Sequence, residues 1–191
     1  MILPIVLYGD PVLRVKCKPV TTVTEEVRTL VQDMLETMHE AKGVGLAAPQ
    51  VGVSIQLAVI DVSHDPECVT YVQIDGADVV LTDIMPLIFL NPKLDPSKDK
   101  EMGEEGCLSI PDYREKVKRS AAVKVTYETL DGKTQTLEAD GLLARALQHE
   151  IDHLNGILFI DRLSAVAKVG MKRKIKRLME EWEEDGLIKR K

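Results

Sequence analysis

The sequence predicts an α+β fold in which small mixed or antiparallel β-sheets surround a central helix, with a further helix at the C-terminal end. Three observations support this class. Residues 141–154 carry apolar side chains at helical spacing, and a second helical pattern begins at residue 164. Residues 122–127 and 134–139 alternate between apolar and polar side chains around an Asp-Gly turn, which is typical of a β-hairpin.

The composition is that of a soluble globular chain, and its 191 residues are enough for one sizeable core. The net charge of −6 argues against nucleic acid, including specific DNA, as the main partner. No run is apolar enough to span a membrane and no signal peptide is evident, so we expect a cytoplasmic protein without membrane contact. The three cysteines show no paired spacing, and we expect Cys17 and Cys68 to be small buried residues.

The N-terminal third contains an extended arm, a helix and a glycine-rich segment. Prolines interrupt the arm. Thr22 and Glu25 form a predicted capping box for an amphipathic helix, which Gly43 ends. Residues 43–52 then lead into an apolar strand at 55–60.

The middle of the chain is less regular. Residues 61–86 are polar and acidic with two short β-branched runs, and we interpret them as a surface excursion that contains a hairpin. Residues 87–90 are typical of a buried strand, which a following Asn-Pro pair closes. Residues 95–100 are expected to form a charged loop.

The C-terminal helix combines an apolar stripe with strongly charged faces. Its first half is basic and its second half is acidic. We interpret it as a helix that packs on the core with a solvated outer face, and a docking surface for an RNA-containing partner is the alternative. The apolar residues expected on one side are Val166, Val169, Ile175, Leu178, Met179 and Trp182.

Two histidines in the central helix point to a metal site. His149 and His153 are four residues apart, so they share one helix face, where two imidazoles can bind the same ion. Glu150 is rotated by about 100° from His149, which keeps its carboxylate beside the ion, where it can transfer a proton during hydrolysis. Two solvated surface histidines are the alternative, but the surrounding apolar residues indicate a buried helix.

A catalytic centre of this type usually has three protein ligands and an open position. No histidine follows His153, and Asp161 is too close in sequence to act as the downstream acid of a peptidase. Cys107, which lies between Gly106 and Pro111, is the other candidate.

The glycine-rich segment is expected to lie against a ligand. It lacks the third glycine and the preceding strand of a dinucleotide-binding loop. Glycine allows close approach of a ligand to the backbone, and Gln50 would direct a neutral amide into the same space.

Three motifs occur in order: Gly43-Val44-Gly45-Leu46-Ala47-Ala48-Pro49-Gln50, Glu105-Gly106-Cys107-Leu108-Ser109 and His149-Glu150-Ile151-Asp152-His153. With them, the sequence resembles the peptide deformylase family over nearly its whole length, and its C-terminal helix is similar to that of a bacterial subgroup. The resemblance implies hydrolysis of the formyl group from the N-terminal formyl-methionine of new polypeptides, which releases formate. It also implies a single catalytic domain at 1–163, with a helix and tail at 164–191 that pack on it or extend from it.

The resemblance assigns roles at the metal. Cys107, His149 and His153 would bind one divalent ion, usually Fe(II) in this family, with zinc, nickel or cobalt able to occupy the site. Glu150 would move the proton. The catalytic residues that it implies are Glu150, the Gln50 amide and the Leu108 backbone N–H, of which the last two would stabilise the oxyanion.

The resemblance also assigns the substrate contacts, which are Val44, Gly45, Glu105, Gly106, Arg145 and Ala146. We expect Arg145 to pack its aliphatic stem against the methionine and to extend its charged head into solvent. The partners that it implies are new formyl-methionine polypeptides. A transient ribosome contact through the C-terminal helix is the alternative that the basic half of that helix leaves open.

Two other functions compete with this hypothesis. The first is another metallohydrolase with the same histidine motif, such as a small peptidase. The second is a non-catalytic scaffold whose closed metal site would need Cys17 or Cys68 as a fourth ligand. Neither cysteine lies in a glycine-framed loop.

Overall fold

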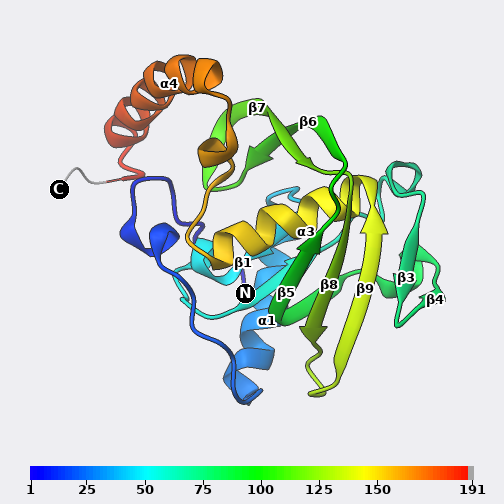
Figure 1. Cartoon of the computed structure of the whole chain (residues 1–191). Helices are drawn as coiled ribbons and strands as arrows, with labels where there is room; N and C mark the ends of the chain where they lie inside the picture. The colour runs from blue at the N-terminus through cyan, green and yellow to red at the C-terminus, as the bar shows by residue number, and fades with distance from the viewer. Residues whose placement is uncertain (189–191) are drawn as a thin grey trace.

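The computed structural model describes residues 1–188, whose strands form two antiparallel sheets (Figure 1). The strands are β1 (Gly45–Ala47), β2 (Leu57–Ile60), β3 (Val72–Ile74), β4 (Ala77–Asp78), β5 (Leu87–Pro96), β6 (Lys100–Cys107), β7 (Ile110–Ser120), β8 (Ala122–Glu128) and β9 (Thr134–Asp140). The larger sheet has the order β1-β2-β5-β8-β9-β3-β4, and β6 pairs with β7 in the smaller one. Residues 189–191, the end of the tail expected at 164–191, lie outside the described residues.

The helices confirm the predicted α+β class. The α-helices are α1 (Glu25–Glu40), α2 (Leu81–Ile84), α3 (Gly141–Leu154) and α4 (Ala165–Glu184), and the 3₁₀ helices are η1 (Pro11–Arg14), η2 (Ala48–Val51), η3 (Pro66–Cys68) and η4 (Phe159–Arg162). Figure 1 shows α3 running through the middle of the molecule, and its apolar side chains share one core cluster with the larger sheet. The helix predicted at 141–154 and the hairpin of β8 and β9 are both confirmed.

The predicted capping box of α1 is wrong. The helix begins at Glu25, and its cap is Thr24, whose side chain accepts a hydrogen bond from the Val27 N–H at 3.4 Å. This start places Glu25 and Glu26 in the first turn, where the helix dipole stabilises carboxylates. With Thr22 as the cap, Glu25 and Glu26 would be the third and fourth helical residues, farther from the end of the helix.

Two predictions in the middle of the chain are also wrong. Strand β5 does not close at residue 91 but continues to Pro96, with a register shift between Leu90 and Lys93 that accommodates a proline without an N–H. The charged loop expected at 95–100 therefore shrinks to residues 97–99. The β6–β7 sheet was not predicted. Both of its strands are rich in charged residues and contain few apolar ones, so no apolar–polar alternation marks them as strands.

The excursion at 61–86 contains the expected hairpin, formed by β3 and β4. It is more than a surface loop, because β3 pairs with β9 and so extends the larger sheet. Cys17 is buried as predicted, whereas the prediction for Cys68 is wrong because this residue is exposed in η3.

Helix α4 packs on the core through the C-terminal part of the predicted apolar side. The buried side chains of α4 are Ile175, Leu178 and Trp182, and they join a cluster with residues of β7 and η4. Val166 and Val169, expected on the same side, are 84% and 74% exposed. Within residues 1–188, no helix has the length and apolar character needed to cross a membrane.

We predict that Gly156→Ala destabilises the fold more than Gly132→Ala. Both glycines have a positive φ, +73° and +75°, which costs a residue with a side chain about 1 kcal/mol. A Cβ at Gly156 would also lie 2.5 Å from the Arg14 carbonyl oxygen, whereas one at Gly132 would meet nothing within 4 Å. Urea denaturation should show a loss of about 3 kcal/mol in the free energy of unfolding for Gly156→Ala. Equal losses in the two variants would contradict this account.

Candidate metal centre and substrate cleft

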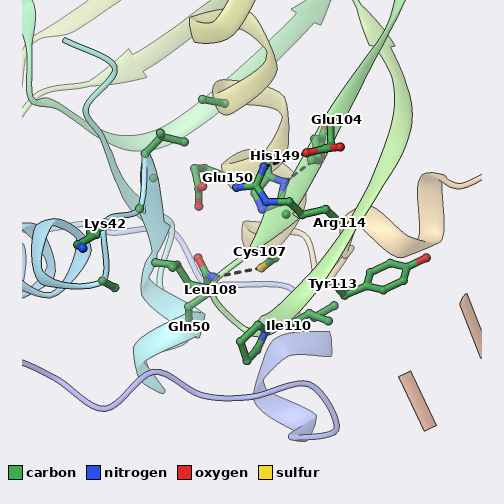
Figure 2. Close-up of a pocket in the computed structure, with 18 of the residues that line it drawn as sticks. Lys42, Gln50, Glu104, Cys107, Leu108, Ile110, Tyr113, Arg114, His149 and Glu150 are labelled. Atoms are coloured by element: carbon green, nitrogen blue, oxygen red, sulfur yellow. Dashed lines mark hydrogen bonds and ion pairs between the residues drawn. The ribbon is translucent and has the colours of Figure 1, made fainter. Parts of the chain in front are cut away.

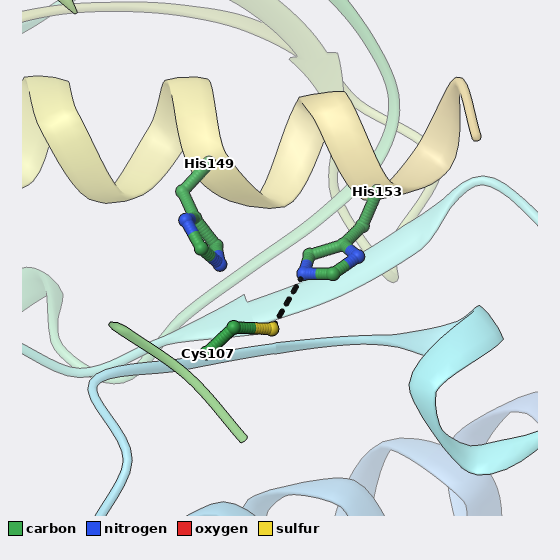
Figure 3. A group of neighbouring side chains, drawn as sticks. All are labelled: Cys107, His149 and His153. Atoms are coloured by element: carbon green, nitrogen blue, oxygen red, sulfur yellow. Dashed lines mark hydrogen bonds between the residues drawn. The ribbon is translucent and has the colours of Figure 1, made fainter. Parts of the chain in front are cut away.

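Three potential metal ligands meet where β6 ends against α3 (Figure 3). Their donor atoms, the Cys107 Sγ and one nitrogen each of His149 and His153, lie within 4.8 Å of one another. The two histidines are one turn apart on α3, and Cys107 comes from the end of β6, where the pairing with β7 shifts register after Gly106. The structure thus brings together the three ligands proposed from the sequence.

The two imidazoles direct their Nε2 atoms toward the sulfur. His149 Nδ1 lies 3.0 Å from a Glu105 carboxylate oxygen, which leaves Nε2 for a metal ion. His153 Nε2 lies 3.2 Å from the Cys107 Sγ, and its buried Nδ1 has no hydrogen-bond partner among the described residues. One thiolate and two imidazoles fit a divalent transition metal with one open position.

The charges around the site favour a cation. Burial lowers the pKa of His149, but Cys107 and the Glu105 carboxylate outweigh it and raise that pKa well above its usual value. Burial and the charge of His149 hold the pKa of His153 well below the usual value, so this ring is neutral. Neutral imidazole is the form that binds a metal.

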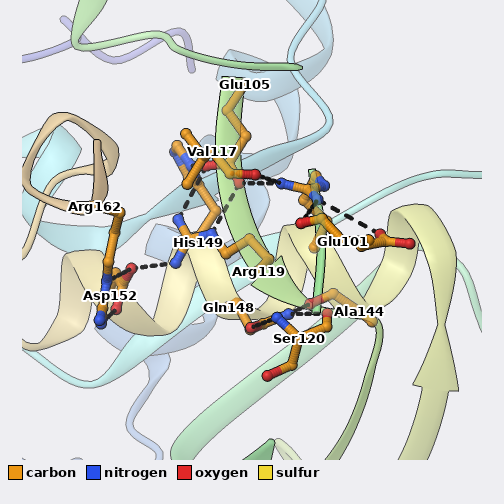
Figure 4. Close-up of polar contacts among 11 residues, drawn as sticks. Glu101, Glu105, Val117, Arg119, Ser120, Ala144, Gln148, His149, Asp152 and Arg162 are labelled. Atoms are coloured by element: carbon orange, nitrogen blue, oxygen red, sulfur yellow. Dashed lines mark hydrogen bonds and ion pairs between the residues drawn. The ribbon is translucent and has the colours of Figure 1, made fainter. Parts of the chain in front are cut away.

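Glu105 is a buried carboxylate surrounded by cationic groups (Figure 4). Arg119 donates to both of its oxygens, at 2.8 and 2.9 Å, and Arg145 donates to one of them at 2.9 Å. Burial raises the pKa of Glu105, but Arg119 and His149 more than offset this effect and hold that pKa well below its usual range. The carboxylate is therefore ionised and can fix the orientation of the His149 ring.

The expectation that the Arg145 head extends into solvent is wrong. Arg145 is buried, and its guanidinium also donates to the Val117 carbonyl at 3.1 Å. The reason lies in two features that the sequence pattern did not reveal. Glu105 offers a buried negative charge, and Gly103 leaves the space, because a Cβ there would lie 2.6 Å from the Arg145 Cζ.

Glu150 lies beside the donor atoms with a free carboxylate oxygen. Its Oε2 is buried and has no hydrogen-bond partner among residues 1–188. Burial, the largest effect, raises the pKa of Glu150 to about 7. Gly45 leaves the space that this carboxylate occupies, because a Cβ at Gly45 would lie 2.3 Å from Glu150 Oε1. The group can therefore accept or release a proton near neutrality.

The Gln50 side chain is oriented by bonds at both ends of its amide. Its oxygen accepts from the Ala47 N–H at 2.9 Å, and its nitrogen donates to the Ser109 Oγ at 3.2 Å and toward the Cys107 Sγ at 3.4 Å (Figure 2). The amide nitrogen thus points toward the Ser109 hydroxyl and toward the Cys107 sulfur, one of the three metal donors. Ser109 belongs to one of the three sequence motifs but had no predicted role, and Arg119 was not predicted because no local pattern marks it.

A cleft of about 650 Å³ opens beside these groups (Figure 2). One wall is the segment 41–45, the other is formed by 104–108 and 110–114, and α3 contributes the remaining side. The cleft lining includes the predicted residues Val44, Gly45, Gln50, Glu105, Gly106, Cys107, Leu108, Arg145, Ala146, His149 and Glu150. Strand β1 forms one edge of the larger sheet, so its outer side faces this cleft.

Comparison with known proteins decides the family. Residues 2–169 match the family model described as polypeptide deformylase. The chain belongs to this family. As a deformylase, it is a metal-dependent hydrolase that removes the N-terminal formyl group from new polypeptides in protein biosynthesis, as the sequence motifs predicted.

Individual relatives agree with this assignment. A peptide deformylase from Acidobacterium capsulatum is 45% identical over 184 residues, which cover 95% of this chain and 99% of the relative. One from Rhizobium meliloti is 47% identical over 166 residues, covering 86% and 87%. A crystal structure of a peptide deformylase from Legionella pneumophila superposes with a TM-score of 0.78 at 38% identity, covering 96% and 98%.

We predict that Gly45→Ala impairs turnover without loss of metal. The added methyl group would displace the Glu150 carboxylate, and a misplacement of about 1 Å in a catalytic group can reduce the rate about 100-fold. Formate release by a metal-loaded sample, with metal content measured on the same sample, tests this. The matched control is Gly170→Ala in α4, where a Cβ meets nothing within 4 Å. Normal kcat in Gly45→Ala would show that Glu150 tolerates displacement.

Proposed function

We propose that Cys107, His149 and His153 bind one divalent metal ion, natively Fe(II), with zinc, nickel or cobalt able to replace it. The observation that carries the proposal is the convergence of these donors with the free Glu150 carboxylate in one cleft. The resemblance to the family supports iron. A bound ion would polarise the formyl carbonyl and lower the pKa of water from 15.7 toward about 7.

The protein's own groups then handle the proton and the developing charge. Glu150 accepts the proton of the attacking water at its unpartnered Oε2 and delivers it to the departing amine nitrogen. The Gln50 amide and the Leu108 backbone N–H donate to the oxyanion. Loss of one such donor costs about 3 kcal/mol of transition-state stabilisation. The bond between Gln50 and Ala47 pre-orients the amide for this task.

The substrate peptide binds as an added strand. Its backbone pairs with Val44 and Gly45 at the free edge of β1, while Glu105 and Gly106 line the opposite wall. Arg145 and Ala146, one turn before His149, line the methionine pocket. Arg145 takes part through its stem, because its head is bound to Glu105.

The competing functions have weaker support. A peptidase with the same helix would need a downstream ligand, whereas the donor group found within residues 1–188 uses Cys107 from β6. A closed structural site would need a fourth donor, and this group contains three.

We also propose that residues 1–163 form the catalytic domain and that the segment from 164 provides a ribosome contact in the cytoplasm, where the substrate is made. Most basic residues in the first half of α4 are exposed, next to the exposed Val166 and Val169. A cationic surface of this kind suits the phosphate backbone of ribosomal RNA.

Glu150→Gln should retain the metal and lose turnover by about 1,000-fold, because it cannot take the proton. The measurement is anaerobic formate release from a formyl-methionine peptide, with metal analysis of the same sample. Cys107→Ala serves as the complementary variant and should lose metal and activity together. Metal-loaded wild type that released no formate would contradict the activity, and full turnover by Glu150→Gln would contradict its role.

Reversal of charge on α4 should weaken ribosome binding and spare the chemistry. We predict that Lys172→Glu with Arg173→Glu reduces co-sedimentation with ribosomes several-fold while kcat on a short formyl-peptide is unchanged. Both side chains are exposed. The control, Lys98→Glu with Lys133→Glu, makes the same charge change elsewhere on the surface. Equal sedimentation of the two double variants would refute the contact.

A further inference from the structure

A chain of ion pairs connects the metal-site histidine to the turn before α4 (Figure 4). From His149 it runs through Glu105 and Arg119 to Asp152, which Arg162 contacts from η4. We infer that Arg162 is a positioning residue for His149 and that it slows the release of the metal ion. This inference rests on the metal site proposed above.

Asp152 is a buried carboxylate, with a side chain only 8% exposed. Arg162 donates to both oxygens of Asp152, with Nη2 at 2.6 Å from Oδ1 and Nε at 3.1 Å from Oδ2. Arg119 Nη1 also donates to Oδ2. In the described part of the chain, the hydrogen bond to Oδ1 comes from Arg162. Removal of Arg162 would leave a buried carboxylate with one unsatisfied oxygen, which is costly.

Arg119 donates hydrogen bonds to two carboxylates, those of Glu105 and Asp152. Its Nε and Nη2 hold Glu105, and its Nη1 holds Asp152. Without Arg162, the unsatisfied charge of Asp152 would draw the Arg119 guanidinium away from its fork on Glu105. Glu105 would then orient His149 less firmly. Partners of this kind around metal-binding histidines contribute 10- to 100-fold to metal affinity.

The neighbouring ion pair of Arg14 and Asp161 provides a matched control. Arg14 is 41% exposed and Arg162 is 46% exposed, and their acidic partners, Asp161 and Asp152, lie in η4 and in α3. The partner of Arg14, however, is itself 40% exposed and is not part of the chain that leads to His149. Loss of either arginine thus removes one ion pair made by a partly exposed arginine. Only loss of Arg162 disturbs the ion-pair chain that leads to His149.

The experiment uses the full chain loaded with cobalt, whose visible spectrum reports on the ligand geometry. Release of cobalt to a chelator is followed for wild type, Arg162→Met, Arg162→Lys and Arg14→Met. We expect Arg162→Met to release the ion about tenfold faster with an altered spectrum. Arg162→Lys should fall between it and wild type, because it keeps the charge and loses the fork. Arg14→Met should not release the ion faster than wild type, because it removes a positive charge that acts on His153 and leaves the ion-pair chain intact.

Two results would overturn the inference. The first is release from Arg162→Met at the wild-type rate, which would show that the ion-pair chain does not reach His149. The second is cobalt release from Arg14→Met that is as fast as release from Arg162→Met. This result would indicate that loss of either ion pair loosens the whole segment between α3 and α4. Failure of the metal site itself is detected separately, because Cys107→Ser should abolish the thiolate-to-cobalt absorption of the wild-type spectrum. A spectrum that is unchanged in Cys107→Ser would overturn both the proposed metal site and this inference.

Discussion

The buried charge of Glu105 is the interaction on which the site depends. This carboxylate comes from β6, while Arg145 and His149 come from α3 and Arg119 comes from β7. The ion pairs therefore join the small sheet to the central helix and fix the distance between Cys107 and the two histidines. Removing one partner of such a buried pair typically costs about 3–5 kcal/mol, because the other charge stays buried and unpaired. A loosely held β6 would not keep its cysteine beside α3.

Helix α3 combines two tasks that conflict in most helices. Leu143, Leu147 and Ile151 fill the main core, while His149 and His153 bring polar nitrogens into nearly the same depth. Burying such groups is unfavourable unless each finds a partner. Glu105 supplies that partner for His149, whereas one nitrogen of His153 has no partner among residues 1–188. The helix thus tolerates incomplete hydrogen bonding at the position where the chemistry takes place.

The sequence predicts an element correctly where the residues that specify it are close together in the chain. Helix α3 and the β8–β9 hairpin have patterns within a few residues of one another, and both were predicted correctly. The β6–β7 sheet has charged residues on much of both strands, so alternation could not mark it. The burial of the Arg145 head and the part played by Arg119 depend on residues 14 to 44 positions away in the chain. No local pattern encodes such distant partners.

The two acidic residues of the site differ in their surroundings, and this difference separates their tasks. Arg119, Arg145 and His149 surround Glu105, which stays ionised. Glu150 is also buried, but one of its oxygens has no partner among residues 1–188. Burial, with a further contribution from the negative charge of Glu105, raises the pKa of Glu150 to about 7. Two carboxylates whose environments move their pKa values apart can divide structural and proton-transfer work. The paired one maintains the geometry of the ligands, and the unpaired one remains free to exchange a proton with the substrate.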